Sequence, residues 1–513
     1  MVSPYSREAS TPYSMVDRKW VVLSNTTIGS LMASIDGSIV LISLPTIGRQ
    51  LPGASPGILL WVMLSYSVVT TTLLLSFGRL SDMHGRVRLY TLGFAVFTIG
   101  SGFASFSQTG VELLLARVVQ GAGAAFLWSN SAALLTDAFP VGERGKALGI
   151  NQVSVLAGSA IGLVLGGVLT ATLGWRSIFW VNLPIGVVGS VWAYLQLHET
   201  HRPERGVPVD WVGNLSFGGG LTLALVGLTV GSLSGWSNPF VLGSIAAGVA
   251  LLVLFVYAEE RVPHPMFDLT LFRIRTFVAG NVAAGLAALA RGAFSFVMVF
   301  YLQGVLGDSA LTAGVLLLPL SIAFVISGPL SGFISDSRGA RGLGTAGLLV
   351  GALGFLVLLN VPANGPYLVL GTSMALLGLG QGMFAAPNRA EVMSSVPASQ
   401  RGVAAGIGVT LLNAGMLGSL ALAFTVVASD VPRATLGAIF AGTGGAIVDA
   451  SAFMAGLHLL FAIGLVLMLA AAVGNALRGR EGRSGSEIYQ VRRTTRPPVL
   501  AGVRVHDGTS SSK

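Results

Sequence analysis

The chain has 513 residues, of which 53% are hydrophobic and only 10% are charged, and its mean hydropathy is +0.77. A composition this apolar excludes a set of soluble domains and indicates an integral membrane protein. The sequence holds no cysteine, which excludes disulfides and thiolate metal sites, and its six histidines form no metal-binding pattern. The net charge of +9 is spread between apolar segments, so we expect no nucleic-acid partner.

Fourteen apolar stretches are long enough to cross a bilayer, which requires about 20 residues each. Long uninterrupted apolar runs favour helices over the alternating strands of a barrel. The first stretch lacks a small-residue cleavage site, so we expect it to be retained. The predicted spans are 20–44, 58–77, 89–107, 111–136, 146–172, 177–197, 211–233, 239–258, 276–302, 311–334, 343–361, 366–390, 401–427 and 451–475.

The basic residues lie mainly in alternate connections. With a cytoplasmic amino terminus, 25 of the 30 Lys and Arg residues fall on the cytoplasmic side, and only Arg49, Arg176 and Arg433 fall outside. Because cytoplasmic loops carry an excess of basic residues, both termini are predicted to be cytoplasmic and the protein to lie in the cell membrane. The basic tail 476–513 is expected to be disordered and to meet anionic membrane lipid.

An internal repeat relates the two ends of the chain. The turn "GRLSDMHGR" at Gly78 is matched in spacing by "GFISDSRGAR" at Gly332, an offset of 254 residues. Further along, "ERGKALGI" at Glu143 is matched by "QRGVAAGI" at Gln400, an offset of 257. Two ordered matches at nearly constant offset predict two homologous halves, an organisation typical of transporters.

The repeat and the spans divide the chain into five parts. The predicted parts are a cytoplasmic tail at 1–19, a six-helix bundle at 20–197, a linker with two inserted helices at 198–258, a second six-helix bundle at 259–475 and the tail at 476–513. The fold class is therefore all-α, with six, two and six spanning helices and halves related by a pseudo-twofold axis.

Five segments of the sequence resemble motifs of the major facilitator superfamily. "GRLSDMHGRVR" is similar to the signature loop of that family, "LLLARVVQGAGAA" from Leu113 to its fourth-helix motif, and "GSAIGLVLGG" from Gly158 to its antiporter motif. "SIDGSIVLISLP" from Ser34 resembles the first-helix motif of drug/proton antiporters, and "DWVG" at Asp210 the fourteen-helix multidrug exporters. The sequence departs from these motifs at Leu163, where proline is usual, and at Leu41, where asparagine is usual.

Asp36 lies inside the first span, where a charge costs about 2.5–3.5 kcal/mol on insertion scales and requires a partner or a proton. At about 1.5 Å rise per residue, Asp36 lies roughly 13 Å below the outer end of its span. Arg117 and Gln120 lie roughly 9 and 14 Å below the outer end of the fourth span, so the three can share one level. We predict that Asp36 and Arg117 couple proton movement to transport. A permanent salt bridge that only fixes helix packing is the alternative.

Three residues are predicted to line a substrate cavity: Gln120, Arg291 and Asn413. Arg291 is the second lone charge inside a span, and subtracting the repeat offset of 254 brings it next to Asp36. Arg291 is expected either to contact an anionic or hydrogen-bonding substrate or to pair with an acid that the sequence does not identify.

The charged turn between the second and third spans is predicted to act as a gate. Asp82, with Arg86 and Arg88, lies at the cytoplasmic mouth, where a carboxylate can cap the amino end of a facing helix. Asp336 is its counterpart in the second half. Forming and breaking this cap would bias a two-state equilibrium. A solvated turn that only sets topology is the alternative.

Small residues form a stripe on the fifth span. Gly158, Gly162 and Gly166 are spaced by four, and Gly167 follows, so another helix can approach closely. The second half has Gly415 and Ser419 at the same stations. Packing alone would explain the stripe, and the family resemblance implies in addition a contact between the halves that favours exchange.

The expected function is proton-coupled export of amphipathic small molecules by a monomer that alternates between two orientations. No nucleotide-binding loop occurs, so a proton gradient, with no cofactor, is the expected energy source. The alternatives are a coupled or facilitative transporter of one metabolite, nutrient or lipid, and a membrane receptor or scaffold that transports nothing. No catalytic triad or carboxylate pair is evident, so an enzyme is not expected.

Overall fold

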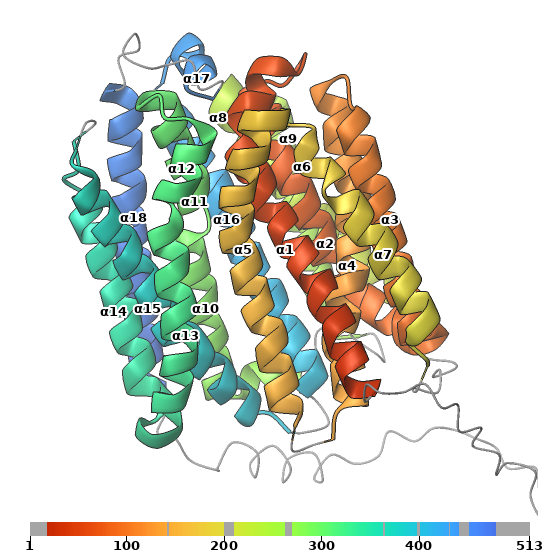
Figure 1. Ribbon diagram of the computed structural model, residues 1–513. Coiled ribbons are helices and arrows are strands. Elements are labelled where there is room, and N and C mark those ends of the chain that lie inside the picture. Colours follow the sequence, from red (N-terminus) through yellow and green to blue (C-terminus); the bar gives the residue numbers. More distant parts are fainter. Residues whose placement is uncertain are drawn as a thin grey trace, which may run out of the picture.

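A computed structural model describes residues 18–140, 143–199, 210–261, 269–362, 365–397, 401–429, 431–440 and 451–478. These residues form a bundle of long helices that run side by side (Figure 1). Fourteen helices in the described part are long and apolar enough to cross a membrane, which confirms the predicted all-α fold class. The predicted tail 476–513 falls outside the described residues from position 479 onward.

The first half and the inserted pair occupy residues 18–259. The first half consists of α1 (Arg18–Gln50), α2 (Pro56–His84), α3 (Arg86–Phe106), α4 (Gly110–Ala138), α5 (Arg144–Leu173), α6 (Ser177–Trp180) and α7 (Asn182–Gln196). The inserted helices are α8 (Trp211–Ser234) and α9 (Pro239–Glu259).

The second half follows a short 3-10 helix. It consists of η1 (Leu269–Arg273), α10 (Arg275–Arg291), α11 (Phe294–Phe300), the π-helix η2 (Tyr301–Val305), α12 (Ala310–Leu316), α13 (Leu318–Arg338), α14 (Ala340–Leu358), α15 (Tyr367–Ser394), α16 (Arg401–Ser429), α17 (Arg433–Phe440) and α18 (Ser451–Ala476).

Local sequence explains where several helices begin and end. Ser55 caps α2, whose first residue is a proline, and Thr109 caps α4 in a reciprocal arrangement with Glu112. Gly85 separates α2 from α3 with a φ of 105°, and Gly339 separates α13 from α14 with a φ of 81°. These two glycines occupy the same station of the repeat, where the tight turn requires a positive φ.

We call the end of the bundle that holds the turn at Gly85 the turn end. The turn end holds this turn and both ends of the described chain, Arg18 and Arg478, and lies at the bottom of Figure 1. The opposite end holds the connection between α1 and α2. Some predicted spans are interrupted in the structure: the ninth is divided into α10, α11 and η2, and the tenth into α12 and α13.

Close glycine contacts reproduce the sequence repeat in three dimensions. A Cβ on Gly121 of α4 would lie 2.7 Å from the Tyr66 carbonyl oxygen of α2. At an offset of 257, a Cβ on Gly378 of α15 would meet the carbonyl oxygen of Leu320 on α13. Since Leu320 is 254 residues after Tyr66, the same helix stations pack in the same way in both halves.

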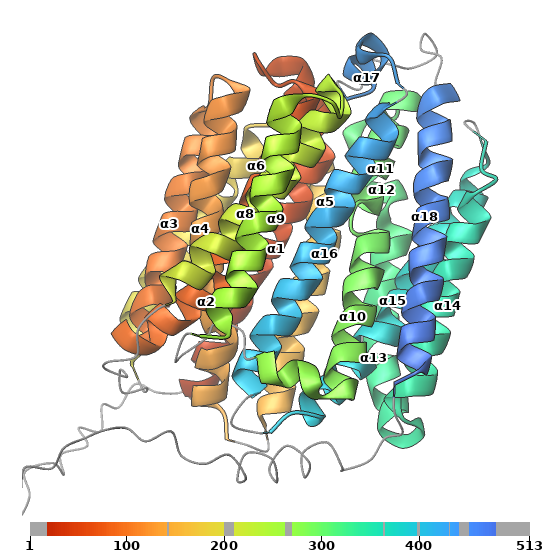
Figure 2. The ribbon, with the colours of Figure 1, turned by 180° about the vertical axis from the view of Figure 1, so that it is seen from behind.

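The inserted pair lies against the second half at the turn end. Phe217 of α8 and Phe255 of α9 share an apolar cluster with Phe277, Val392 and Ile407 of the second half. Figure 2 shows α8 and α9 from behind, between the helices of the first half and α16. The inserted helices therefore join the two bundles along one side.

The two halves meet directly at the opposite end. Gln303 of η2 donates a hydrogen bond from Nε2 to the Ile42 carbonyl oxygen on α1, at 2.8 Å. A Cβ on Gly167 of α5 would lie 2.7 Å from the Ala310 carbonyl oxygen on α12. Backbones this close leave no passage between α5 and α12, so the halves are closed against each other there.

Candidate functional site

Asp36, Arg117 and Gln120 form one buried cluster, as their predicted common level requires. Asp36 Oδ2 lies 2.5 Å from Arg117 Nη1, and both side chains are fully buried. Gln120 Nε2 donates to Asp36 Oδ1 at 2.8 Å, while its Oε1 accepts from the same Arg117 nitrogen at 2.6 Å. The three side chains thus close a ring of hydrogen bonds between α1 and α4.

A fourth member of the cluster is Asn182, at the start of α7. Its Nδ2 donates to Asp36 Oδ1 at 2.9 Å and to Ser101 Oγ at 3.2 Å. Ser101 in turn donates to the Phe179 carbonyl oxygen. Sequence reasoning missed Asn182 because it carries no charge; the signal that could have revealed it is an amide inside the apolar run of the sixth span.

Arg117 is held from a third direction by α2. Its Nε donates to the Val62 carbonyl oxygen at 3.3 Å, and its guanidinium carbon lies 4.2 Å from the centre of the Tyr66 ring. This stacking is a cation–π contact, which stabilises a desolvated arginine. One nitrogen, Nη2, is buried without a hydrogen-bond partner.

The cluster joins α1, α2, α4 and α7 through one carboxylate. In this arrangement the charge on Asp36 is matched by Arg117 and by two amide donors, which is what a buried ion pair requires. A proton reaching Asp36 would cancel the charge that holds Arg117. The packing of these helices at this site therefore depends on the ion pair between Asp36 and Arg117.

At the turn end, Arg86 is the centre of a second charged group. Its guanidinium contacts Asp82 at 2.7 Å and both carboxylate oxygens of Asp137, at 2.7 and 2.9 Å. These contacts join the α2–α3 turn to the end of α4. Sequence reasoning did not identify Asp137.

A carboxylate does cap a helix at this turn, but neither the residue nor the helix is the predicted one. Glu199 accepts the backbone N–H groups of Arg86 and Val87, both at 3.0 Å, at the amino end of α3. Asp82, which was expected to cap a facing helix, instead binds Arg86 within its own turn. Arg88 is exposed and makes no hydrogen bond or ion pair within the described part of the chain. The side chain of Asp336 lies outside the described residues.

The second half has an equivalent link built from other residues. Arg478, directly after α18, lies 2.5 Å from Glu391 on α15 and also donates to Asn388. Asn388 donates to the Gly280 carbonyl oxygen on α10 at 3.2 Å. Arg478, two residues beyond α18, is thus tied to α15, and Asn388 ties α15 to α10. Ala340 occupies the repeat position of Arg86.

The glycine stripe on α5 packs mainly within its own half. Cβ atoms on Gly158, Gly162 and Gly166 would lie 3.0, 2.7 and 2.9 Å from carbonyl oxygens of α1. These three residues therefore bring α1 and α5 together, so the expectation of a contact between halves is wrong for them. Gly167 alone among the four predicted residues lies against the second half, at Ala310 and Leu311.

In the second half, α16 packs against α10 in the same manner. A Cβ on Gly415 would lie 2.6 Å from the Gly285 carbonyl oxygen, and Ser419 Oγ accepts the Ala293 N–H at 2.9 Å. Both small residues that the repeat offset indicated are thus used in helix contacts.

The three predicted cavity residues occupy different environments. Gln120 is completely buried in the Asp36 cluster, so in this conformation it is not available to a substrate. Asn413 on α16 and Arg291 on α10 are half-buried. The structure does not bring either of them into the Asp36 cluster.

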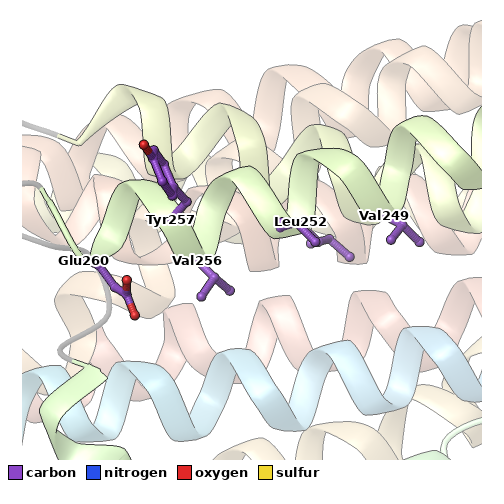
Figure 3. A pocket seen from close by; sticks show the side chains of 6 residues that line it. Val249, Leu252, Val256, Tyr257 and Glu260 are labelled. Carbon is purple, nitrogen blue, oxygen red and sulfur yellow. The ribbon is translucent and has the colours of Figure 1, made fainter.

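A shallow groove follows α9 on the outside of the bundle. It is lined by Val249, Leu252, Val253, Val256, Tyr257 and Glu260. Figure 3 shows Val256 and Glu260 pointing toward α16, drawn in pale blue, and Tyr257 pointing away from it. Exposed apolar side chains on a spanning helix normally face lipid. The groove therefore differs in kind from the polar cluster on α1. The described residues hold no group of three potential metal ligands.

Comparison with known proteins agrees with this fold. The family model described as Major Facilitator Superfamily matches residues 26–213 and 211–420. The peptide transporter PepTSo has a similar structure, with a TM-score of 0.64 at 15% identity, covering 88% of this chain and 97% of that one. At this identity the likeness concerns the fold.

Several sequence relatives are named as transporters or resistance proteins. The riboflavin transporter RibZ of Clostridioides difficile is 32% identical, over 77% of this chain and 85% of the relative. The multidrug resistance protein Stp of Mycobacterium tuberculosis is 33% identical, over 75% and 72%. The puromycin resistance protein of Streptomyces alboniger is 31% identical, over 87% and 90%. The chain is thus a multi-pass membrane protein that belongs to the Major Facilitator Superfamily, a family of small-molecule transporters, and its relatives include drug exporters of that family.

Proposed function

We propose that the protein exports amphipathic small molecules in exchange for protons, with the turn end and both termini in the cytoplasm. The observation that carries this proposal is the Asp36 cluster: a carboxylate at the centre of a spanning bundle, bound to Arg117, Gln120 and Asn182 from two other helices. The names of the multidrug and puromycin resistance relatives support export of drug-like compounds.

The proposed cycle uses the link between charge and packing at Asp36. In the closed cluster the carboxylate is matched by Arg117. Protonation would release Arg117 and Asn182, so that α1, α4 and α7 could shift relative to one another. A two-state transporter in which only one state favours the protonated carboxylate exchanges a proton in each cycle.

The gating part of the proposal concerns Arg86. Its bonds to Asp82 and Asp137 tie the turn to the end of α4, on the proposed cytoplasmic side. Their breaking and forming would bias the equilibrium between orientations. Exposed ion pairs of this kind contribute about 1 kcal/mol or less each, enough to shift populations by about fivefold.

A second candidate is transport of one specific metabolite, favoured by the riboflavin transporter among the relatives. Purified protein in vesicles distinguishes the two, with puromycin, ethidium and riboflavin as probes. An acidic interior drives uptake by an exchanger, an acidic exterior drives uptake by a co-transporter, and neither affects the end point of facilitated diffusion.

The decisive variant is Asp36→Asn, which removes the titrating group and retains its size. We expect gradient-driven uptake to fall at least tenfold, since neutral Asn cannot exchange a proton. The matched control is Glu112→Gln, because Glu112 is an exposed capping residue on the same helix as Arg117. Equal gradient-driven uptake by Asp36→Asn and wild type would refute coupling through this residue.

A further inference from the structure

Arg291 is a cation inside the bundle with no partner in the part of the chain that the structure describes. It is the last residue of α10, in the ninth span, and makes no ion pair or hydrogen bond with the described residues. Its Nε is enclosed without an acceptor, yet the residue as a whole is only half-buried. The two terminal guanidinium nitrogens are not enclosed in this way, so they remain accessible.

The other arginine inside a span is treated very differently. Arg117 is bound to a carboxylate, an amide oxygen and a backbone carbonyl. A charge within the membrane is costly and is normally matched by a partner. Among the described residues, only the negative carboxyl end of its own helix offsets this cost for Arg291.

The sequence repeat explains why Arg291 has no acidic partner among the described residues. With the offset of 257 that relates α4 to α15, the stations of Arg117 and Gln120 are occupied by Met374 and Leu377, both fully buried. With the offset of 254 that relates α1 to α10, Arg291 corresponds to Gly37 of the first half. Gly37 is half-buried, and a Cβ there would meet no atom within 4 Å. Both positions thus border open space, and no acid among the described residues of the second half contacts Arg291.

The backbone beside Arg291 is fixed by another helix. The α-helix is interrupted between Arg291 and Phe294, and the freed N–H of Ala293 donates to Ser419 Oγ on α16. A Cβ on Gly292 would lie 2.8 Å from Met416 Cα, so α16 packs tightly against the break. Broken spanning helices of this kind are typical of transporter binding sites.

We infer that Arg291 binds an anionic group of the transported molecule, such as a carboxylate, sulfonate or phosphate. A guanidinium offers paired donors to such groups, and a charge-assisted bond in a partly desolvated site is strong. The inference rests on the proposed transport function and names its substrate class: amphipathic anions, with the apolar part of the molecule in the surrounding bundle.

The test measures binding rather than transport, with two dyes of one tricyclic scaffold. Fluorescein carries negative charge at neutral pH, and rhodamine 123 carries positive charge. Dye anisotropy is titrated with the full-length protein in detergent, for wild type, Arg291→Met, Arg291→Lys and the control Arg49→Met, which removes an exposed arginine elsewhere.

We expect wild type to bind fluorescein, and Arg291→Met to weaken that binding about ten- to a hundredfold, as loss of a charge-assisted bond predicts. Arg291→Lys should retain part of the affinity, and Arg49→Met all of it. Rhodamine 123 binding should change less than twofold.

Two results would overturn the inference: no fluorescein binding by wild type at saturating protein, or an equal loss of both dyes in Arg291→Met. Thermal unfolding of each variant identifies a folding defect, and Arg291→Lys keeps the test decisive if Arg291→Met unfolds. Because no gradient is involved, failure here is distinct from failure of proton exchange, which the vesicle experiment detects.

Discussion

At the residue scale, Asp36 and Arg117 depend on each other. Both are completely buried, and their attraction offsets a desolvation cost that neither could bear alone. Removing both charges leaves an apolar contact, whereas removing one leaves the other unmatched. The pair is thus a structural element as well as the proposed proton site, and stability measurements can separate the two roles.

Arg117→Met should destabilise the protein strongly, by about 3–5 kcal/mol, because the Asp36 carboxylate would remain buried without its cation. The double variant with Asp36→Leu should recover at least half of the loss in Tm, since both charges are then gone. Thermal unfolding in detergent of both single variants, Arg117→Met and Asp36→Leu, and of the double variant measures the coupling between the two residues. If the loss in Tm of the double variant equals the sum of the losses of the two single variants, Asp36 and Arg117 are not energetically coupled.

At the element scale, close helix contacts are made at glycines. Gly162 lies where a Cβ would be 2.7 Å from the Ile35 carbonyl oxygen, and Asp36, the proposed proton site, follows one residue further along α1. The glycine stripe on α5 therefore positions α1. In the second half, the contacts of Gly292 and Ala293 with α16, directly after α10, likewise position Arg291.

Gly162→Ala should lower the Tm by several degrees, because its methyl group would collide with backbone atoms that cannot move independently. The matched control is Gly149→Ala on the same helix, where a Cβ meets nothing within 4 Å. That control should be neutral or slightly stabilising, since alanine is favoured over glycine in helices by about 1 kcal/mol. Equal Tm values for the two variants would contradict the packing role.

The elements were largely predictable because each spanning helix carries its own hydropathy signal. Fourteen spans and the repeat follow from composition and spacing. The break between α11 and η2 does not, since no proline or charge marks it, whereas Arg291 precedes the break after α10 and Pro319 lies at the start of α13. The common depth of Asp36, Arg117 and Gln120 in the bundle followed from the rise per residue of a helix. The roles of Asn182 and Glu199 could not be predicted, because they depend on tertiary contacts with distant helices.

At the scale of the whole molecule, the structure is closed at one end. Gln303 and Gly167 join the halves at the end opposite the turn, and α8 and α9 join them along one side. An alternating mechanism requires this closure to be reversible. The end that closes would then face outward, given the proposed orientation.

A disulfide across the closed end tests reversibility. A Cβ on Gly314 would lie 3.7 Å from Val164 Cα, close enough to join Val164→Cys with Gly314→Cys, and 2.5 Å from the Leu163 carbonyl oxygen, so α5 and α12 must separate slightly to accept the new side chain; the natural chain contains no other cysteine. Oxidation should stop transport, and reduction should restore it. Each single-cysteine variant serves as the control. Undiminished transport by fully cross-linked protein would contradict alternation at this end.

Proton exchange through Asp36 is the central step of the proposed transport cycle. The most direct measurement follows internal pH in vesicles that contain the purified protein and no imposed gradient, after a transported compound is added outside. We predict that the vesicle interior becomes more alkaline with wild type and with Glu112→Gln, and that its pH is unchanged with Asp36→Asn. Entry of the compound through wild type without proton movement, or equal proton movement in Asp36→Asn, would contradict it.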